Sequence, residues 1–413
     1  MTDNDLYQQI LGLTSPWRVS DVELRLDADE VRVHVVHDVS LGRARCPVCQ
    51  SACAGYDTSS ERRWRHLDTC QLRTYLVCSV PRVQCPEHGI HVAHVPWSDP
   101  GSGFTAAFEA LAIAILRATS TQSRAAALLR LSATQVHDVM HRAVTRGLLR
   151  RSQEEIMEHV GIDEKSIHSG HSYMSVLSDT GGKRVVEVTE NRTLLSACEL
   201  LRSGISPSQK PHVRTVSMDM WKAFQSAQEE ELPNADRVHD RFHIVKYLSD
   251  AVDLTRRSEH ARLTKTGDKT LSKTKYVWLK NPDNMSSKQK ELLDSLANAE
   301  LETAKVWAFK DVFNEFFACQ SVAQGKEFFE KWFKGAIDLN NRHLTKVANM
   351  LSEHLDGLLN YLKHRTTNAT AEGINSRIQH IKASARGYRK FENFRIAILF
   401  HLGKLDMNPH RSL

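Results

Sequence analysis

Long apolar runs are what the sequence most clearly lacks. Nowhere in its 413 residues are there the roughly 20 consecutive apolar positions that a membrane-spanning helix needs, and no secretory leader is recognisable. Aromatic residues make up only 7% of the sequence and charged residues make up 25%, which is typical of proteins that fold in water. We therefore expect a cytoplasmic protein with no membrane partner.

Cysteine is scarce outside one short stretch that holds six of the eight. CPVC supplies Cys46 and Cys49, and CPEH supplies Cys85 and His88. Two such knuckles separated by a strand-rich segment have the spacing of a zinc ribbon, with three thiolates and one imidazole around one Zn²⁺. Disulfides are the alternative, but a cytosolic chain keeps its thiols reduced. The other cysteines are interpreted as core residues, the first two also as alternative ligands: Cys53, Cys70 and Cys78.

Acidic residues are scarce in two parts of the chain. Residues 361–413 carry ten Lys/Arg against three Asp/Glu, and residues 103–151 carry seven Arg against two acids. The whole chain has a net charge of only +6, so its positive charge is concentrated. This pattern indicates a polyanion that is contacted at more than one place. A solubilising surface is the alternative.

The first basic region has the pattern of a helix-turn-helix. Three consecutive segments between residues 104 and 144 show helical periodicity, with a turn at Leu131 and with Ser132 as the cap of the third helix. That helix is predicted to lie in a major groove. Its candidate DNA-facing residues are Thr134, Gln135, His137 and Asp138, and Arg142 completes the DNA-binding set.

The middle of the chain alternates strand and helix patterns. A strand ending at Asp163 is followed by a hairpin, a helix, a strand ending at Asp219, a helix and a short strand ending at Asp240. Three meandering strands and two helix–strand units are the order of the ribonuclease-H-like fold, in which the first and fourth strands are neighbours. Asp163 and Asp219 are then expected to meet at adjacent strand ends, where two carboxylates repel unless cations neutralise them. A pair of Mg²⁺ ions does this and also assists phosphoryl chemistry.

A later helix offers a third carboxylate. At about 100° per residue, Ile374 and Ile378 share one face, whereas Glu372 and Asn375 share the opposite one. Packing of the apolar face on the sheet would bring Glu372 to the two aspartates. A solvated amphipathic helix is the alternative. The basic continuation is expected to follow a phosphate backbone through Lys382, Arg386, Arg389, Lys390 and Arg395.

The joint order of these motifs resembles the zinc-finger DDE transposases of bacterial insertion sequences, most closely the ISL-three family. The likeness covers nearly the whole chain, from CPVC…CPEH to NATAEGINSRIQHIKASARGYRKFENFR. It implies that Asp163, Asp219 and Glu372 are the DDE triad, which holds two Mg²⁺ or Mn²⁺ ions. It also implies that Asp240 and His243 form the family's D-x-x-H motif, whose histidine reaches the DNA near the cleavage site.

One ribbon ligand departs from the family pattern, in which the last ligand is commonly a cysteine and not a histidine such as His88. This affects the choice of ligand but not the presence of the site.

The patterns and the resemblance together predict a multidomain α+β protein. We expect a β-hairpin and zinc ribbon in residues 1–100 and a helix-turn-helix in 101–152. A ribonuclease-H-like catalytic core is expected in 153–253 and 361–413, interrupted by a helical insertion domain in 254–360. Within the insertion, Phe309, Phe313, Phe316 and Phe317 are predicted to form its own core, and the Lys- and Ser-rich residues 264–290 a mobile loop or a DNA-contacting arm.

The expected function is DNA transposition by metal-dependent strand cleavage and strand transfer. The expected partner is double-stranded DNA, as terminal inverted repeats and as target, so we expect association with the nucleoid and no small-molecule substrate. Pairing two ends demands two protomers, hence a homodimer on DNA. The alternatives are a structure-selective nuclease with the same fold and a catalytically inactive DNA-binding regulator, although the intact triad argues against the latter.

Overall fold

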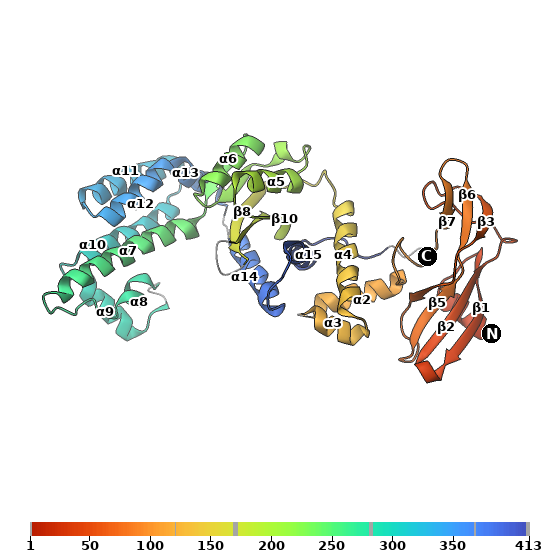
Figure 1. The fold of residues 1–413 in the computed structure, drawn as a ribbon. Helices are drawn as coiled ribbons and strands as arrows, with labels where there is room; N and C mark the ends of the chain where they lie inside the picture. The colour runs from red at the N-terminus through yellow and green to blue at the C-terminus, as the bar shows by residue number, and fades with distance from the viewer. Residues whose placement is uncertain (1, 120, 168–171, 281–283, 367–368, 410–413) are drawn as a thin grey trace. The chain divides into compact units, whose positions relative to one another are not determined.

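The computed structural model describes residues 2–119, 121–167, 172–280, 284–366 and 369–409 (Figure 1). The chain divides into two compact units. The first contains the residues up to Arg151, Ser384–Gly387 and the residues from Leu405 onward; the second contains Ser152–Ala383 and Tyr388–Lys404. The described residues that follow Lys404 thus belong to the first unit, whereas the residues before them, from Tyr388, belong to the second.

The first unit begins with a helix and two small sheets. The strand orders are β1-β2-β5-β4 and β3-β6-β7. The predicted hairpin is confirmed as β1 and β2, and the alternating Val31, Val33 and Val35 of β2 are buried, whereas Leu24 at the end of β1 is exposed. The elements are α1 (Asp3–Ile10), β1 (Trp17–Arg25), β2 (Glu30–His37), β3 (Ala54–Thr58), β4 (Arg62–Arg65), β5 (Arg73–Cys78), β6 (Pro81–Cys85) and β7 (Gly89–Val92).

Three helices complete this unit and confirm the predicted helix-turn-helix pattern. Ala125, Val136 and Val139 are fully buried between them. Ser132 caps the third helix, and its hydroxyl accepts a hydrogen bond from the Gln135 amide while the Gln135 side chain accepts one from the Ser132 amide. The helices are α2 (Ala106–Ala118), α3 (Gln122–Leu129) and α4 (Ala133–Arg150).

An extended segment from the end of the chain, residues 405–409, packs on α4 and is called the strap below. Its burial alternates, with Leu405, Met407 and Pro409 buried and the two residues between them exposed. Gly147 of α4 leaves the space for it, since a Cβ at that position would lie 2.6 Å from the Cβ of Leu405. A glycine is therefore needed here for close approach and not for an unusual backbone angle.

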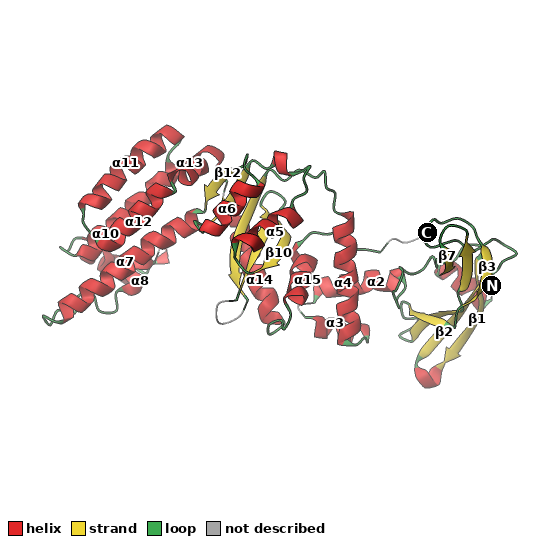
Figure 2. Cartoon of the chain, turned by 45° about the horizontal axis from the view of Figure 1, so that its top comes forward, coloured by secondary structure: helices red, strands yellow, loops and turns green. Residues whose placement is uncertain are grey.

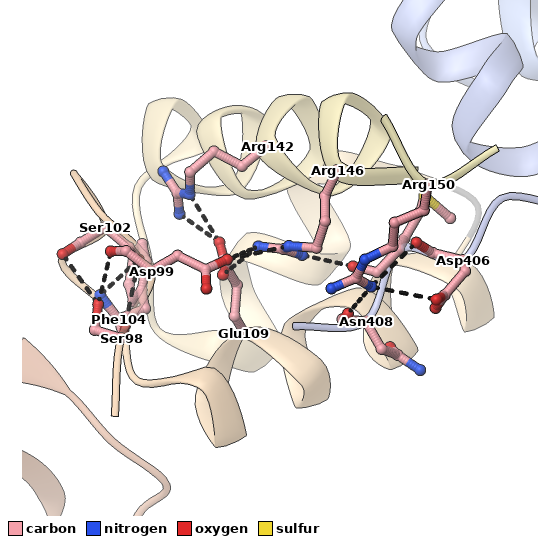
Figure 3. A network of polar contacts seen from close by, with 11 residues as sticks. Ser98, Asp99, Ser102, Phe104, Glu109, Arg142, Arg146, Arg150, Asp406 and Asn408 are labelled. Carbon is pink, nitrogen blue, oxygen red and sulfur yellow. Dashed lines mark hydrogen bonds and ion pairs between the residues drawn. The ribbon is translucent and has the colours of Figure 1, made fainter. Parts of the chain in front are cut away.

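Arginines of α4 hold the strap through its backbone (Figure 3). Arg146 Nη1 donates to the carbonyl of Met407, and Arg150 Nη1 donates to the carbonyl of Asn408 at 2.6 Å. Charged donors make the stronger hydrogen bonds of a protein. The strap is thus fixed by both apolar burial and charge-assisted hydrogen bonds.

The second unit contains a five-stranded sheet of order β10-β9-β8-β11-β12. Its first three strands are antiparallel, and β11 runs parallel to both β8 and β12. This order confirms that the first and fourth strands are neighbours. The strands are β8 (His159–Ser166), β9 (Tyr173–Asp179), β10 (Arg184–Glu190), β11 (Thr215–Met218) and β12 (Asp236–His239), and the helices nearest to them are α5 (Leu194–Gly204), α6 (Lys222–Glu231), α14 (Ala369–Ser384) and α15 (Phe391–Leu402).

Helices lie on both faces of this sheet (Figure 2). Helices α5 and α6 share one core with Val160 and Ile162 of β8. Because side chains alternate along a strand, Asp163 points to the opposite face, where Asn375 of α14 contacts it. Helix α15 packs against β10.

A helical segment between β12 and α14 has a core of its own. Phe313 and Phe316 are fully buried there and Phe317 nearly so, which confirms that these aromatics pack internally. The helices are α7 (Arg241–Thr264), α8 (Lys275–Leu279), α9 (Ser287–Ala297), α10 (Glu302–Val312), α11 (Val322–Asp338), α12 (Arg342–Glu353) and α13 (Leu355–His364). Within the described ranges, no helix combines the length and the hydropathy of a membrane span.

The prediction of a mobile loop over residues 264–290 is wrong for its centre. Helix α8 lies there, and Leu271 and Trp278 are fully buried in the helical core. The composition misled because two large apolar side chains are enough to anchor a segment that is otherwise polar.

Candidate functional site

Strands β8 and β11 are adjacent in the sheet, so Asp163 on β8 and Asp219 after β11 are neighbours near the carboxyl ends of these strands. The parallel register of β8 and β11 sets Ser217 opposite Gly161. Asp219 directly follows Met218, the last residue of β11, so continuing this register by two positions brings Asp219 beside Asp163. Strand β8 continues beyond Asp163 to Ser166, so the first aspartate lies within the strand and not at its end.

Neutral donors contact the oxygens of both aspartates. The Asn375 side-chain amide donates to Oδ2 of Asp163, and the Tyr247 hydroxyl donates to Oδ1 of Asp219 at 3.3 Å. Burial, reinforced by the charge of Asp219, raises the pKa of Tyr247 to about 12, so the hydroxyl keeps its proton. In the described part of the chain, no lysine or arginine forms an ion pair with either aspartate, and the ion-pair partner of Asp219 is a histidine, His243.

The D-x-x-H motif lies at the start of α7. Asp240 is buried and caps the helix, since its Oδ1 accepts from the Phe242 amide at 3.0 Å. His243 Nδ1 lies 3.4 Å from Oδ2 of Asp219, and His243 Nε2 lies 3.9 Å from Oδ2 of Asp240. The imidazole is therefore placed between the acid of its own motif and the second aspartate.

Glu372 is exposed on the first turn of α14, and Asn375 lies one turn further along. Ile374 and Ile378 are buried as predicted, and Asn375, which lies on the polar face opposite them, is buried as well. Its contact with Asp163 shows that α14 passes beside β8. Glu372 does not belong to any group of three or more possible ligand atoms that lie within 4.8 Å of one another among the described residues. The carboxylates of Asp163, Asp219 and Glu372 therefore do not form such a group.

The two cysteine knuckles meet as predicted. The ligand atoms of Cys46, Cys49, Cys85 and His88 all lie within 4.8 Å of one another. Cys85 Sγ is 3.5 Å from His88 Nδ1 and 3.7 Å from Cys49 Sγ. Hydrogen bonding to Ser51 lowers the pKa of the Cys49 thiol to about 6, which favours the thiolate that zinc requires. Three sulfurs and one imidazole nitrogen in a closed group fit a structural Zn²⁺.

The other cysteines of this stretch lie outside this group of four residues. Cys53 and Cys78 are buried as predicted, and burial raises the pKa of Cys78 to about 12. Cys70 is exposed, so its prediction as a core residue is wrong. It lies in a turn with a positive φ of 49°.

The first turns of α4 carry the residues predicted to face DNA. Of these, Thr134, Gln135 and Asp138 are exposed and His137 is partly exposed. Gln135 also closes the capping box described above, so it has a structural role in addition to the predicted one.

Arg142 has an internal partner (Figure 3). Its Nε donates to Oε1 of the buried Glu109 at 2.8 Å, and Arg146 Nη2 donates to the other oxygen at 3.0 Å. A buried carboxylate needs such pairing. Because Arg142 neutralises Glu109, we do not propose it as a DNA contact.

Arg395 is committed to an internal pair as well. Its Nε and Nη2 donate to the two oxygens of the buried Glu187, at 2.8 and 2.7 Å, and it too is left out of the DNA-contacting set. Lys382 donates to the carbonyl of Ser166 at 3.2 Å. The remaining bases of this set are exposed: Arg386, Arg389 and Lys390.

Tyr247 is the site residue that sequence reasoning missed. It follows Asp240 by seven residues and His243 by four, so the three share one face of α7. Extending the D-x-x-H motif along that helical face would have found it.

Comparison with protein-family models identifies three domains. The DDE transposase model of the ISL3 family matches residues 160–398, which is more than half of the chain. The model described as the zinc-finger of transposase IS204/IS1001/IS1096/IS1165 matches residues 42–88, and the helix-turn-helix domain of transposase family ISL3 matches residues 93–144.

Similar proteins agree with this. The transposase for insertion sequence element IS1001 from Bordetella parapertussis is 25% identical over 359 residues, covering 86% of this chain and 87% of that protein. The transposase for insertion sequence element IS1557 from Mycobacterium tuberculosis is 23% identical over 433 aligned positions, covering 98% of this chain and 96% of that protein. Because the zinc-finger, helix-turn-helix and DDE models of this family all match, and the DDE model alone covers more than half of the chain, the chain belongs to the ISL3 family of DDE transposases.

Proposed function

We propose that this transposase binds the terminal inverted repeats of its insertion sequence as a homodimer and catalyses metal-dependent strand cleavage and strand transfer. The supporting observation is the register that sets Asp163 opposite Asp219, with neither aspartate ion-paired to a described lysine or arginine. Two adjacent carboxylates are unfavourable unless a cation lies between them. The strand order supports a ribonuclease-H-like core, and the helical segment α7–α13 is proposed as an insertion into it.

The donor set fits Mg²⁺ or Mn²⁺, which prefer carboxylate oxygens. Asp163 and Asp219 are proposed as ligands, with Glu372 completing the set from the helix that touches Asp163 through Asn375. When bound, two such ions neutralise the carboxylates, activate the attacking oxygen and stabilise the leaving one.

Protein groups orient the reaction around this centre. Asn375 and Tyr247 fix one oxygen of each aspartate, which holds the carboxylate planes. His243 is proposed to contact the DNA near the cleaved phosphodiester. Water cleaves that bond, and the freed 3′-OH attacks target DNA in line, so no covalent bond between protein and DNA is required.

The DNA-binding modules are proposed to divide recognition between them. The start of α4 is proposed to read base edges through Thr134, Gln135 and His137, since their side chains are accessible. The zinc ribbon is proposed as a second DNA-binding module of the same unit. Phosphates are proposed to be contacted by Lys382, Arg386, Arg389 and Lys390.

The test is cleavage of a duplex that carries the terminal repeat flanking the gene. Asp163→Asn, Asp219→Asn and Glu372→Gln are each expected to abolish cleavage while the affinity for the duplex stays within about twofold. Glu392→Gln is the matched control, because Glu392 lies on α15, where it pairs with Arg395. Cleavage by Glu372→Gln at the wild-type rate would remove Glu372 from the ligand set.

A further inference from the structure

Trp221 is an exposed indole at the catalytic edge of the sheet. It follows Asp219 by two residues and precedes the first residue of α6. Its exposed fraction is 43%, which is high for the residue type that gains most from burial. The same residue type dominates the energetics of binding surfaces.

The indole is held in one orientation. Its Nε1 donates to the backbone carbonyl of Arg192 at 3.1 Å. The Arg192 guanidinium lies over the Trp221 ring at 4.8 Å and over the Tyr173 ring at 3.9 Å, so one face of the indole is covered by a cation. The exposed fraction therefore belongs to the rest of the ring, and a ligand that stacks on it meets a side chain that is already ordered.

Arg192 is itself fixed from the strand that carries the first aspartate. Glu164, directly after Asp163, accepts from Arg192 Nη1 through both carboxylate oxygens, at 2.9 and 3.1 Å. The chain Glu164–Arg192–Trp221 thus runs from the residue beside Asp163 to the residue beyond Asp219. The carboxylate of Glu164 is thus paired with a guanidinium, although Glu164 is adjacent to a proposed metal ligand.

We infer that Trp221 stacks on an unpaired base of the DNA strand next to the cleaved phosphodiester. The inference rests on the proposed function, because it takes the Asp163–Asp219 edge as the place of cleavage. A nucleobase is the planar ligand that DNA brings to this edge, and stacking of a base on an aromatic ring does not depend on sequence. Because the indole is pre-ordered, little conformational entropy is lost on stacking, and the energy gained offsets the cost of unstacking the base.

The experiment uses the full chain and the terminal-repeat duplex with 2-aminopurine at the first nucleotide on either side of the cleaved bond. Wild-type protein is expected to change the 2-aminopurine fluorescence when Ca²⁺ replaces Mg²⁺ to prevent cleavage, because the base exchanges its stack in the duplex for a stack on the indole. Trp221→Ala is expected to lose that change and to cleave about 5- to 150-fold more slowly, which is the fold-change of one lost base–aromatic stack. Trp221→Phe, which keeps a ring, is expected to retain most of both.

Two controls separate stacking from a structural effect. Leu254→Ala removes an apolar side chain of equal exposure, 43%, on α7 and is expected to behave as wild type. A duplex with an abasic site at the stacked position is expected to restore cleavage by Trp221→Ala, because no base then has to be held out of the duplex.

Three outcomes overturn the inference. Normal fluorescence change and rate in Trp221→Ala would show that the indole contacts no base. A slow rate that the abasic duplex does not restore would make Trp221 a packing residue. If wild-type protein neither binds nor cleaves the duplex, the proposed function fails as well, and the first two outcomes cannot be confused with this one.

Discussion

At the scale of single residues, the two aspartates are oriented by side chains that carry no charge. Asn375 and Tyr247 each donate to one carboxylate oxygen. A lysine or arginine in either place would neutralise the aspartate and compete with a metal ion, whereas an amide or a phenol orients the oxygen and leaves its charge available. This arrangement favours a site that binds cations.

Asn375→Ala is expected to weaken metal binding without weakening DNA binding. Loss of the amide frees the Asp163 carboxylate to rotate, and losses of this kind cost about 10- to 100-fold in metal affinity or activity. The measurement is the cleavage rate as a function of Mg²⁺ concentration, whose midpoint should rise. Gln379→Ala is the control, because Gln379 is exposed on the same helix. An unchanged midpoint would show that Asn375 serves packing alone.

His66 makes the stability of the first unit depend on pH. Burial lowers the pKa of His66 to about 4, and its Nδ1 lies 2.9 Å from the Thr105 hydroxyl. In the unfolded chain a histidine titrates near pH 6.5, so the unfolded state binds the extra proton between about pH 6.5 and pH 4. Stability should therefore fall as the pH is lowered through that window, with a slope from this group of up to about 1.4 kcal/mol per pH unit.

His66→Gln, which does not titrate, should flatten that dependence. The measurement is urea unfolding of the full chain between pH 5 and 6.5, monitored at a probe in the first unit. Parallel pH profiles for variant and wild type would mean that His66 is protonated in the folded state as readily as in the unfolded one.

How far single residues can be predicted depends on the kind of information that places them. The proximity of Asp163 and Asp219 can be predicted from strand order, because the register between two neighbouring strands decides which residues lie opposite each other. Asn375 does not follow, since helical periodicity marks it as solvent-facing. In the fold it is buried and donates to an aspartate on a strand more than 200 residues earlier. Arg142 and Arg395 look like free cations for the same reason, as their carboxylate partners are distant in the sequence.

At the scale of elements, the zinc ribbon is tied together by four side chains from two knuckles. Cys85→Ser should release zinc and unfold strands β3, β6 and β7, because structural zinc sites of this size fold only with the metal bound. Elemental analysis of the purified chain should find one zinc, and the variant none. Cys70→Ser is the matched control, because Cys70 is exposed and outside the cluster. Wild-type protein purified without chelators but free of zinc would refute the site.

Element boundaries were predictable where capping and turn signals are local. Ser132 begins α4 as its side-chain chemistry requires, and the hairpin of β1 and β2 follows from alternation. Helix α8 was not predictable, because the anchoring side chains Leu271 and Trp278 stand among lysines and serines. Tertiary burial decides such segments, and local composition does not report it.

At the scale of the whole molecule, the strap ties distant parts of the sequence into the first unit. The substitution Gly147→Ala tests this contact, because its effect on the free energy of unfolding should have opposite signs with and without the strap. Alanine in a helix is favoured over glycine by about 1 kcal/mol, so the substitution should stabilise α4 if nothing packs on it. A Cβ would instead lie 2.6 Å from Leu405, so in the full chain the substitution should lower the free energy of unfolding of the first unit.

In a chain shortened after Lys404, the same Gly147→Ala substitution should raise that free energy. The pair of measurements forms a double-mutant cycle. Equal effects of Gly147→Ala in the full and the shortened chain would show that the strap does not press on α4.

The strap is synthesised long after the helix on which it packs. Arg146 and Met407 are 261 residues apart, so at about 5–20 residues per second the ribosome needs roughly 13 to 50 s to make the second after the first. During that interval the nascent helix-turn-helix lacks the segment that covers Gly147. A product of premature termination lacks it permanently. We therefore expect α4 to reach its full stability only in chains that have been translated past Met407.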